Sequence, residues 1–171
     1  DNKLKNNTVI ATQMSNLGLE RYLKEQGITL VRTGVGDRYV LEAMQEKNAI
    51  LGGEQSGHII LKEFSPTGDG LLASLFMLKI MQQQSKKSSM LRKTFSAVPQ
   101  QLKNIKKCSE ILEEKSVQDA IEKGHETLNG IGRLFIRPSG TEDLIRVMVE
   151  ADEKASLDEV MSKILQAIDA A

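Results

Sequence analysis

The sequence has a single cysteine, no tryptophan and no excess of charge of either sign. Cys108 has no second cysteine in the chain, so an internal disulfide is excluded. Lys and Arg together number 23, as do Asp and Glu, and the formal net charge is zero. A balanced charge gives no indication of binding to nucleic acid or to an anionic membrane surface. Any anion site therefore has to be local.

Several other features are missing as well. No apolar run is long enough to span a bilayer, and the polar residues 1–7 do not resemble a signal peptide. The sequence contains neither zinc-ligand spacing nor a Ser/His/Asp arrangement for nucleophilic catalysis. We therefore expect a soluble, cytoplasmic protein. Because the chain lacks an initiator methionine and leads straight into a strand, we also expect it to be part of a longer chain.

The first half of the sequence alternates short β-branched runs with helix-like stretches. The runs predict strands at 8–12, 28–32, 49–51 and 58–61. The stretches predict helices at 15–26, 38–47 and, after an N-cap at Asp69, through the apolar residues of 71–81. Strands that alternate with helices predict an α/β fold, here a layered βαβ-type domain with a mixed, mainly parallel sheet.

The character of the chain changes after residues 82–89, which contain no core-forming side chain and are interpreted as a link. We therefore predict two domains, residues 1–86 and 87–171. The second is predicted to be a smaller α+β domain, with two helices on one side of an antiparallel sheet. Its strands are predicted at 101–106, 132–137 and 144–150, and its helices behind capping boxes at Ser116 and Ser156.

The loop Gly52–His58 lies between two apolar runs and contains three glycines. Glycine allows a ligand to approach the backbone closely, while Glu54, Gln55, Ser56 and His58 supply donors and acceptors. Such a loop suits a ligand rich in hydroxyl groups. His58 could donate to a hydroxyl or phosphoryl group, or carry a proton near neutral pH. The alternative is a glycine-rich hairpin with solvated side chains and a structural histidine.

A second polar loop, Arg137–Glu142, joins two predicted strands. Guanidinium, hydroxyl and backbone N–H groups are the donors that bind phosphate, and Arg137, Ser139, Gly140 and Thr141 offer all three kinds. Arg146 alternates with apolar residues in the following strand, which places it on the opposite face and within reach of the loop. The alternative is an ordinary Pro-Ser-Gly turn with solvated arginines.

Two shorter glycine-bearing segments give weaker signals. Residues 33–38 connect a strand to a helix N-terminus, where anions and polar ligands often bind, but a tight turn explains them equally well. Gly68-Asp69-Gly70 has only one carboxylate and cannot form the oxygen-rich cage that Mg²⁺ or Ca²⁺ requires. Helix capping is therefore the better interpretation of Asp69, and no metal site is predicted in the chain.

The two polar loops together, Gly-Glu-Gln-Ser-Gly-His at 53–58 and Arg-Pro-Ser-Gly-Thr-Glu at 137–142, resemble the α-D-phosphohexomutase family. Residues 9–19, 35–40 and 67–72 are also similar to it. The resemblance implies four domains around one active-site cleft, of which this chain matches the third and fourth. The fourth would be a domain like the TATA-box-binding protein, tethered by a hinge.

The resemblance also implies roles for individual residues. Sugar hydroxyls would be bound by Glu54, Gln55, Ser56 and His58. The phosphate would be held by Arg137, Ser139, Gly140, Thr141 and Arg146. The loop that carries Gly36, Asp37 and Arg38 would face the interdomain cleft.

The chemical step, by the same resemblance, would lie elsewhere. The phosphorylated serine loop and the three-aspartate Mg²⁺ loop of the family have no counterpart in this chain, so no catalytic residue is expected here beyond His58 as a weak candidate. Mg²⁺ would be bound outside the chain, and a bisphosphorylated sugar would be the intermediate and activator. The implied partners are a hexosamine phosphate and the chain's own N-terminal domains, with no nucleic acid and no membrane; a homodimer is left open.

The substrate class follows from the same resemblance. Gln55 occupies a position where phosphomannomutase/phosphoglucomutase relatives often have methionine, and this favours the amino-sugar branch. The expected activity of the intact enzyme is the interconversion of a hexosamine 6-phosphate and its 1-phosphate, in the synthesis of amino-sugar nucleotides and cell-wall precursors. Two alternatives remain: a phosphomannomutase/phosphoglucomutase, and a non-catalytic phosphosugar-binding module.

Overall fold

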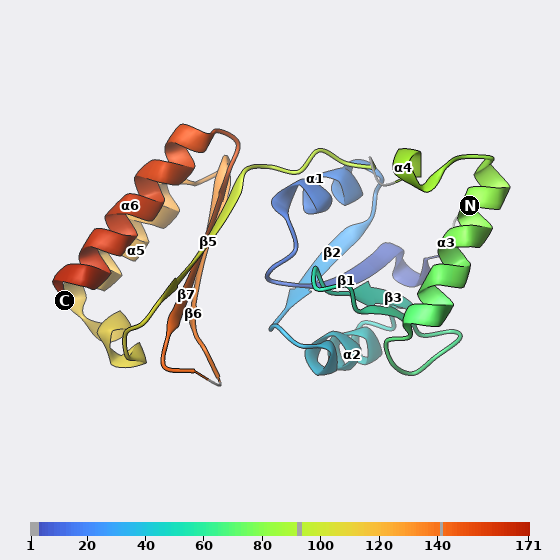
Figure 1. Ribbon diagram of the computed structural model, residues 1–171, viewed down its shortest axis with the longest axis horizontal. Helices are drawn as coiled ribbons and strands as arrows, with labels where there is room; N and C mark the ends of the chain where they lie inside the picture. The colour runs from blue at the N-terminus through green and yellow to red at the C-terminus, as the bar shows by residue number, and fades with distance from the viewer. Residues whose placement is uncertain (1–3, 92–93, 141) are drawn as a thin grey trace. The chain divides into compact units, whose positions relative to one another are not determined.

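The computed structural model describes residues 4–91, 94–140 and 142–171, and the chain divides into two compact units, Asp1–Ser96 and Ala97–Ala171 (Figure 1). The boundary between the units lies after Ser96 in the chain, whereas the sequence predicts it after Lys86. The predicted link at 82–89 is partly wrong, because α3 (Gly70–Gln84) continues into it and α4 (Ser88–Leu91) follows. Met90 and Leu91 of α4 line a hollow with Tyr22, which ties this segment to the first unit.

The first unit is built on a mixed sheet with the strand order β2-β1-β3-β4. The central strand β1 pairs in parallel with β2 and β3, and β4 is antiparallel to β3. A short 3₁₀ helix, η1 (Lys5–Asn7), precedes the sheet. The strands are β1 (Thr8–Thr12), β2 (Thr29–Thr33), β3 (Leu51–Gly53) and β4 (Ile59–Leu61). This confirms the predicted α/β class and the mixed sheet.

Helices α1 (Leu17–Glu25) and α2 (Asp37–Glu46) cover opposite faces of this sheet (Figure 1). The chain passes from β1 to β2 in one direction and from β2 back to β3 in the other, so right-handed crossovers put the two helices on different sides. Asp69 caps α3, since its side chain accepts a hydrogen bond from the Leu72 N–H at 2.9 Å. The predicted helix cap at Asp69 is confirmed.

The two faces of the sheet are not covered equally. On the α2 face, Ile10, Met44 and Ile60 are 0–1% exposed and form a sealed core with Val40 and Ala49. On the other face, strand alternation places Val9, Leu51, Ile59 and Leu61. Three of these four are only half-buried, and Ile59 is exposed.

The second unit is an antiparallel sheet with the strand order β5-β7-β6, covered on one face by α5 and α6 (Figure 1). Ile145, Val147 and Val149 of the central strand point into a core shared with both helices. This confirms the predicted architecture. The elements are β5 (Gln100–Ile105), η2 (Ser109–Glu113), α5 (Lys115–Thr127), β6 (Gly132–Pro138), β7 (Ile145–Ala151) and α6 (Lys154–Ala170).

The capping boxes predicted for these helices are wrong. The N-cap residues are Glu114 and Glu153, and among the described residues no side chain caps either helix. Ser116 and Ser156 instead lie within the first turns. Capping contributes only about 1 kcal/mol, so the burial of apolar residues in the first turns outweighs it in setting where these helices begin.

Candidate functional site

A pocket of about 280 Å³ lies in the first unit, where the parallel strands β1, β2 and β3 end. Ligands of α/β sheets bind at this carboxyl edge because loops from neighbouring strands converge there. The pocket is lined by Thr12, Met14, Val35, Glu54, Gln55 and Ser56. Three of the four predicted sugar-loop residues therefore lie together in one pocket.

Glu54 links two of the loops around the pocket. Its carboxylate is only 8% exposed, and Oε2 accepts a hydrogen bond from the Gly36 N–H at 3.1 Å. Gly36 has a φ of 133°, a conformation that favours glycine over any residue with a side chain. This backbone geometry turns the Gly36 amide toward Glu54 and fixes the loop after β2 beside the sugar loop.

Ser56 and His58 lie next to Glu54 on the β3–β4 hairpin. The Ser56 Oγ is 3.3 Å from the His58 Nδ1, and the Glu54 Oε1 is 3.7 Å from the same nitrogen. The imidazole is 58% exposed and does not contribute to the pocket lining. The imidazole of His58 is therefore accessible to a ligand from solvent.

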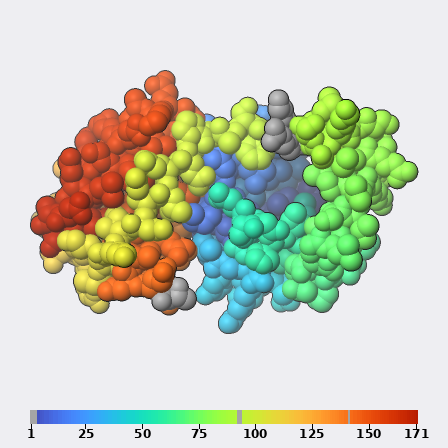
Figure 2. Space-filling view, viewed as in Figure 1, coloured from blue at the N-terminus to red at the C-terminus, as the bar shows by residue number. Residues whose placement is uncertain are grey.

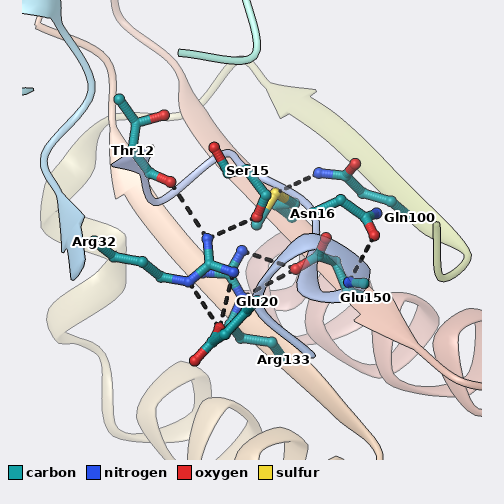
Figure 3. A network of polar contacts seen from close by, with 10 residues as sticks. Thr12, Ser15, Asn16, Glu20, Arg32, Gln100, Arg133 and Glu150 are labelled. Carbon is teal, nitrogen blue, oxygen red and sulfur yellow. Dashed lines mark hydrogen bonds and ion pairs between the residues drawn. The ribbon is translucent and has the colours of Figure 1, made fainter. Parts of the chain in front are cut away.

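Arg32 fixes the loop that follows β1. Its Nη1 donates to the carbonyl oxygens of Ser15 at 2.6 Å and Thr12 at 3.3 Å, while Nε and Nη2 donate to Glu20 Oε2 at 3.1 and 3.0 Å (Figure 3). One partly buried guanidinium thus ties β2, the loop and α1 together. The loop that carries Met14 into the pocket is held by this arginine.

In the second unit, Arg137 of β6 and Arg146 of β7 lie directly opposite each other in the sheet register. The Nε atom of each is buried and has no hydrogen-bond partner among the described residues. Burial, followed by the charge of Arg146, lowers the pKa of Arg137. Like charges on opposite strands repel each other. A bound anion would relieve that repulsion and supply acceptors for the unpaired nitrogens.

The turn that joins these two strands lies beside the arginines. The Ser139 N–H donates to the Leu144 carbonyl at 2.8 Å, which closes the turn. A Cβ on Gly140 would meet nothing within 4 Å, so its backbone is open to a ligand. Thr141, the remaining predicted phosphate ligand, lies outside the described residues. Glu142 forms a long ion pair with Arg146 Nη2 at 3.7 Å.

The remaining predicted cleft residues lie away from the pocket. The Asp37 Oδ1 accepts from the Arg38 N–H at 2.8 Å, and Arg38 is 82% exposed in an ion pair with Glu42. Their assignment to an interdomain cleft stays a prediction. Sequence reasoning missed Thr12, Met14 and Val35 as pocket residues. Their position directly after two parallel strands was the available signal.

Metal binding and membrane insertion find no support in the part of the chain that the structure describes. No group of three or more His, Cys, Asp or Glu side chains there is arranged to hold a metal ion. Within the same residues, no helix is both long enough and apolar enough to cross a bilayer.

Curated relatives of similar sequence are phosphoglucosamine mutases. Those of Brucella ovis, Methylobacterium sp. (strain 4-46) and Cereibacter sphaeroides are 49%, 50% and 51% identical to this chain over 168, 169 and 170 residues. Each match covers 98% of this chain but only 37–38% of the relative. The chain thus spans less than two fifths of the length of these proteins and corresponds to their C-terminal part.

Solved structures of similar fold and models of protein families also match nearly the whole of this chain. N-acetylphosphoglucosamine mutase of Aspergillus fumigatus, in complex with GlcNAc-6P and magnesium, matches 97% of this chain with a TM-score of 0.75 at 19% identity, over 42% of its own length. N-acetylglucosamine-phosphate mutase, in its substrate complex, matches 94% of this chain, over 38% of its own length, with a TM-score of 0.73 at 22% identity. Residues 1–98 match the phosphoglucomutase/phosphomannomutase alpha/beta/alpha domain III, and residues 96–167 match the C-terminal domain. The chain therefore belongs to the phosphoglucomutase/phosphomannomutase family, of which it carries domain III and the C-terminal domain.

Proposed function

We propose that this chain is the substrate-recognising part of a phosphoglucosamine mutase, which interconverts glucosamine 6-phosphate and glucosamine 1-phosphate through a bisphosphorylated intermediate. The identity of 49–51% to phosphoglucosamine mutases along 98% of the chain supports the choice of sugar. The observation that carries the proposal is the cross-strand pair Arg137 and Arg146, with two buried Nε–H groups that lack an acceptor among the described residues.

The phosphate of the sugar is proposed to bind at this arginine pair. Hydrogen bonds between guanidinium and phosphate are charge-assisted and often bidentate, so they fix the orientation of the ligand as well as its position. The open backbone at Gly140 and the hydroxyl groups of Ser139 and Thr141 would complete the site. Because a bisphosphorylated intermediate has to be turned around, this site must bind either of its two phosphates in the same way. Guanidinium, hydroxyl and backbone N–H groups meet that requirement, because they can donate to either phosphate.

The sugar ring is proposed to bind at the Gly53–His58 loop. Gln55 and Ser56 line the pocket and offer an amide and a hydroxyl group. One oxygen of Glu54 already accepts from Gly36, which leaves Oε1 on the His58 side for a sugar hydroxyl or amino group. His58 would donate to the ligand from the rim, and the loop with Gly36, Asp37 and Arg38 would face the cleft.

Phosphoryl transfer itself is proposed to depend on other parts of the whole protein. A transferred phosphoryl group needs a donor and a metal ion that neutralises developing charge. The described residues offer no metal site, so Mg²⁺ and a phosphorylated serine would be contributed by N-terminal domains, with the bisphosphorylated sugar as activator. On this proposal the chain alone binds sugar phosphates without converting them. We place the enzyme in the cytoplasm and leave dimerisation open.

The substrate choice is tested by assaying the complete protein with glucosamine, glucose and mannose phosphates. We expect the highest kcat/KM with glucosamine 6-phosphate. Gln55→Met should lower the preference for glucosamine over mannose phosphate about tenfold, because the methionine cannot hydrogen-bond a polar substituent of the ring. Gln45→Met, an exposed change on α2, is the matched control and should leave the preference unchanged.

Two results of this assay would contradict the proposal. A complete protein that prefers mannose or glucose phosphate would be a phosphomannomutase/phosphoglucomutase. A complete protein that binds sugar phosphates but turns over none of them, and whose gene encodes no serine loop or aspartate loop upstream of Asp1, would be a non-catalytic binding module.

A further inference from the structure

One part of the pocket in the first unit comes from the connection between β1 and α1. Met14 in this connection is half-buried and, with Val35, forms the apolar part of the pocket lining. A pyranose ring carries C–H groups between its hydroxyl groups, so a ring bound in this pocket needs an apolar contact beside its hydrogen bonds. The flexible, polarisable thioether of methionine suits such a contact. The position of Met14 therefore bears directly on how a sugar fits.

The backbone around Met14 forms a tight turn. The Gln13 N–H donates to the Thr33 carbonyl at 2.9 Å, which continues the pairing of β1 with β2 by one residue. The Ser15 N–H donates to the Thr12 carbonyl at 3.0 Å, which closes the turn around Met14. A turn closed by a single backbone hydrogen bond is a weak constraint. It needs further support to hold a side chain in one place.

Arg32 of β2 supplies that support. Its Nη1 donates to the carbonyl oxygens of the first and last residues of the turn, Thr12 at 3.3 Å and Ser15 at 2.6 Å (Figure 3). Its Nε and Nη2 donate to Glu20 of α1, which holds the guanidinium from the other side. The Arg32 side chain is only 11% exposed, so water competes little for these hydrogen bonds. One rigid, planar group thus fixes both ends of the turn.

The polar side chains of the same pocket are less enclosed. Gln55 and Ser56 are exposed, and Figure 2 shows the β3–β4 hairpin that carries them, in teal, at the surface of the first unit. Exposed side chains have to be ordered when a ligand binds, which costs affinity. The part of the pocket that is already fixed before binding, the Met14 turn, therefore contributes most to preorganisation.

We propose that Arg32 is a positioning residue for the sugar. By holding the turn from Thr12 to Ser15 it sets where Met14 meets the ring, and so it sets the affinity for the sugar part of the ligand. Arg32 acts through the turn and not on the ligand itself. A lysine cannot replace it, because an ammonium group lacks the planar fork that reaches two carbonyl oxygens and a carboxylate together. The inference rests on the proposed function, since it takes this pocket to be the sugar site.

The first test is a calorimetric titration of the 171-residue chain with glucosamine 6-phosphate and, separately, with inorganic phosphate, which has no ring. We expect Arg32→Lys to lower the affinity for glucosamine 6-phosphate about tenfold, because a loosened turn has to be ordered again on binding. The affinity for inorganic phosphate should stay within about twofold. A purely structural role of Arg32 would not separate the two ligands in this way.

Arg133→Lys is the matched control. The Arg133 guanidinium is also partly buried, at 18% exposed against 11% for Arg32, and it too is paired with a glutamate. This variant should lower the Tm, as Arg32→Lys should, but leave the affinities for both ligands within about twofold. The comparison separates the positioning of the turn from the general loss of a partly buried guanidinium.

A double variant tests whether Arg32 acts through Met14. Met14→Ala alone should weaken binding of glucosamine 6-phosphate about fivefold, because the apolar contact to the ring is lost. Combined with Arg32→Lys, the loss should be no more than about twofold larger than that of Arg32→Lys alone, since a displaced contact cannot be lost a second time. Independent effects would instead multiply to about fiftyfold, and that result would overturn the inference.

A measurement without ligand tests the positioning itself. Isotope labelling of the methionine methyl groups makes the NMR signal of Met14 observable, and Met14→Ala identifies it. Arg32→Lys should shift or broaden this signal, because the turn then samples several conformations. The signal of Met161, which is 3% exposed in the core of the second unit, should stay unchanged and serves as the internal reference.

Two further outcomes would overturn the inference. One is an Arg32→Lys chain whose affinity for glucosamine 6-phosphate and whose Met14 signal both match those of the unchanged chain. The other is an equal loss of affinity for both ligands, which a general loosening of the fold would cause. An unchanged chain that binds inorganic phosphate but no glucosamine 6-phosphate would overturn the proposed function, and the sugar-binding role of Arg32 with it. The Met14 signal distinguishes that case from a failure of the positioning.

Discussion

At the scale of single residues, Glu54 combines a contact that shapes the fold with a proposed contact to the ligand. The sequence predicts it as a sugar contact, and the structure adds that its Oε2 holds the Gly36 amide at 3.1 Å. The carboxylate is therefore oriented before any ligand arrives. Preorganised acceptors bind more tightly than free ones, because less side-chain entropy is lost on binding.

Gly36→Ala tests this link between the loops. At a φ of 133° an alanine is strained by about 1–3 kcal/mol, so the loop should relax and withdraw its amide from Glu54. We expect a lower Tm and an affinity for glucosamine 6-phosphate reduced about fivefold or more in calorimetric titration. Gly27→Ala, at a φ of 70° after α1, is the control with backbone strain but no contact to the site. If both variants lost stability and neither lost affinity, the link would have no role in binding.

At the scale of secondary-structure elements, β7 organises the second unit through its two faces. One face carries Ile145, Val147 and Val149 into the core. The other carries Arg146 opposite Arg137, at the proposed phosphate site, and Glu150 into an ion pair with Arg133 of β6, whose Nε and Nη2 donate at 2.9 and 2.8 Å (Figure 3). Glu150 is fully buried. A buried carboxylate depends strongly on its partner.

Arg133→Ala should therefore destabilise the chain by about 3–5 kcal/mol, since it leaves a buried charge without its guanidinium. Urea unfolding followed by circular dichroism measures the change. Replacing both partners, as Arg133→Met with Glu150→Leu, should restore most of the stability, because neither charge of the ion pair then remains in the buried site. Lys154→Ala removes an exposed i,i+4 pair on α6 and should have almost no effect. A loss no larger than in that control would show that the buried pair contributes little.

The elements themselves could be predicted from local patterns, but some of their limits could not. Alternation in 144–150 correctly placed β7 and Arg146, and Asp69 correctly marked the start of α3. The helix starts at Ser116 and Ser156 were wrong, because burial of neighbouring apolar residues outweighed a capping preference. The link at 82–89 was partly wrong, since its polar composition gave no sign that α3 continues.

The candidate site was predictable only as far as it is local in sequence. The loops 53–58 and 137–142 were visible because their donors and acceptors lie within six residues of each other. Thr12 and Val35 enter the pocket only because β1 pairs with β2 and β3, which is a non-local event. The cross-strand contact of Arg137 with Arg146 likewise depends on the register of β6 and β7.

At the scale of the whole molecule, the chain spans 37–38% of the length of its curated relatives. The arginine pair of the second unit has two buried Nε atoms without a hydrogen-bond partner among the described residues, and we propose that a bound anion supplies one. On the same proposal, this part of the whole protein recognises the substrate, while the reaction needs the rest.

The most direct test of the central claim is a calorimetric titration of the 171-residue chain with glucosamine 6-phosphate. We expect binding, and we expect Arg137→Ala to weaken it by about 1.5–3 kcal/mol, or roughly 10–150-fold, with little effect on folding. Lys154→Ala, which removes an exposed cation from α6, should leave the affinity unchanged. If Arg137→Ala leaves the affinity unchanged, the proposed phosphate site is wrong, and residues 137–142 form an ordinary turn.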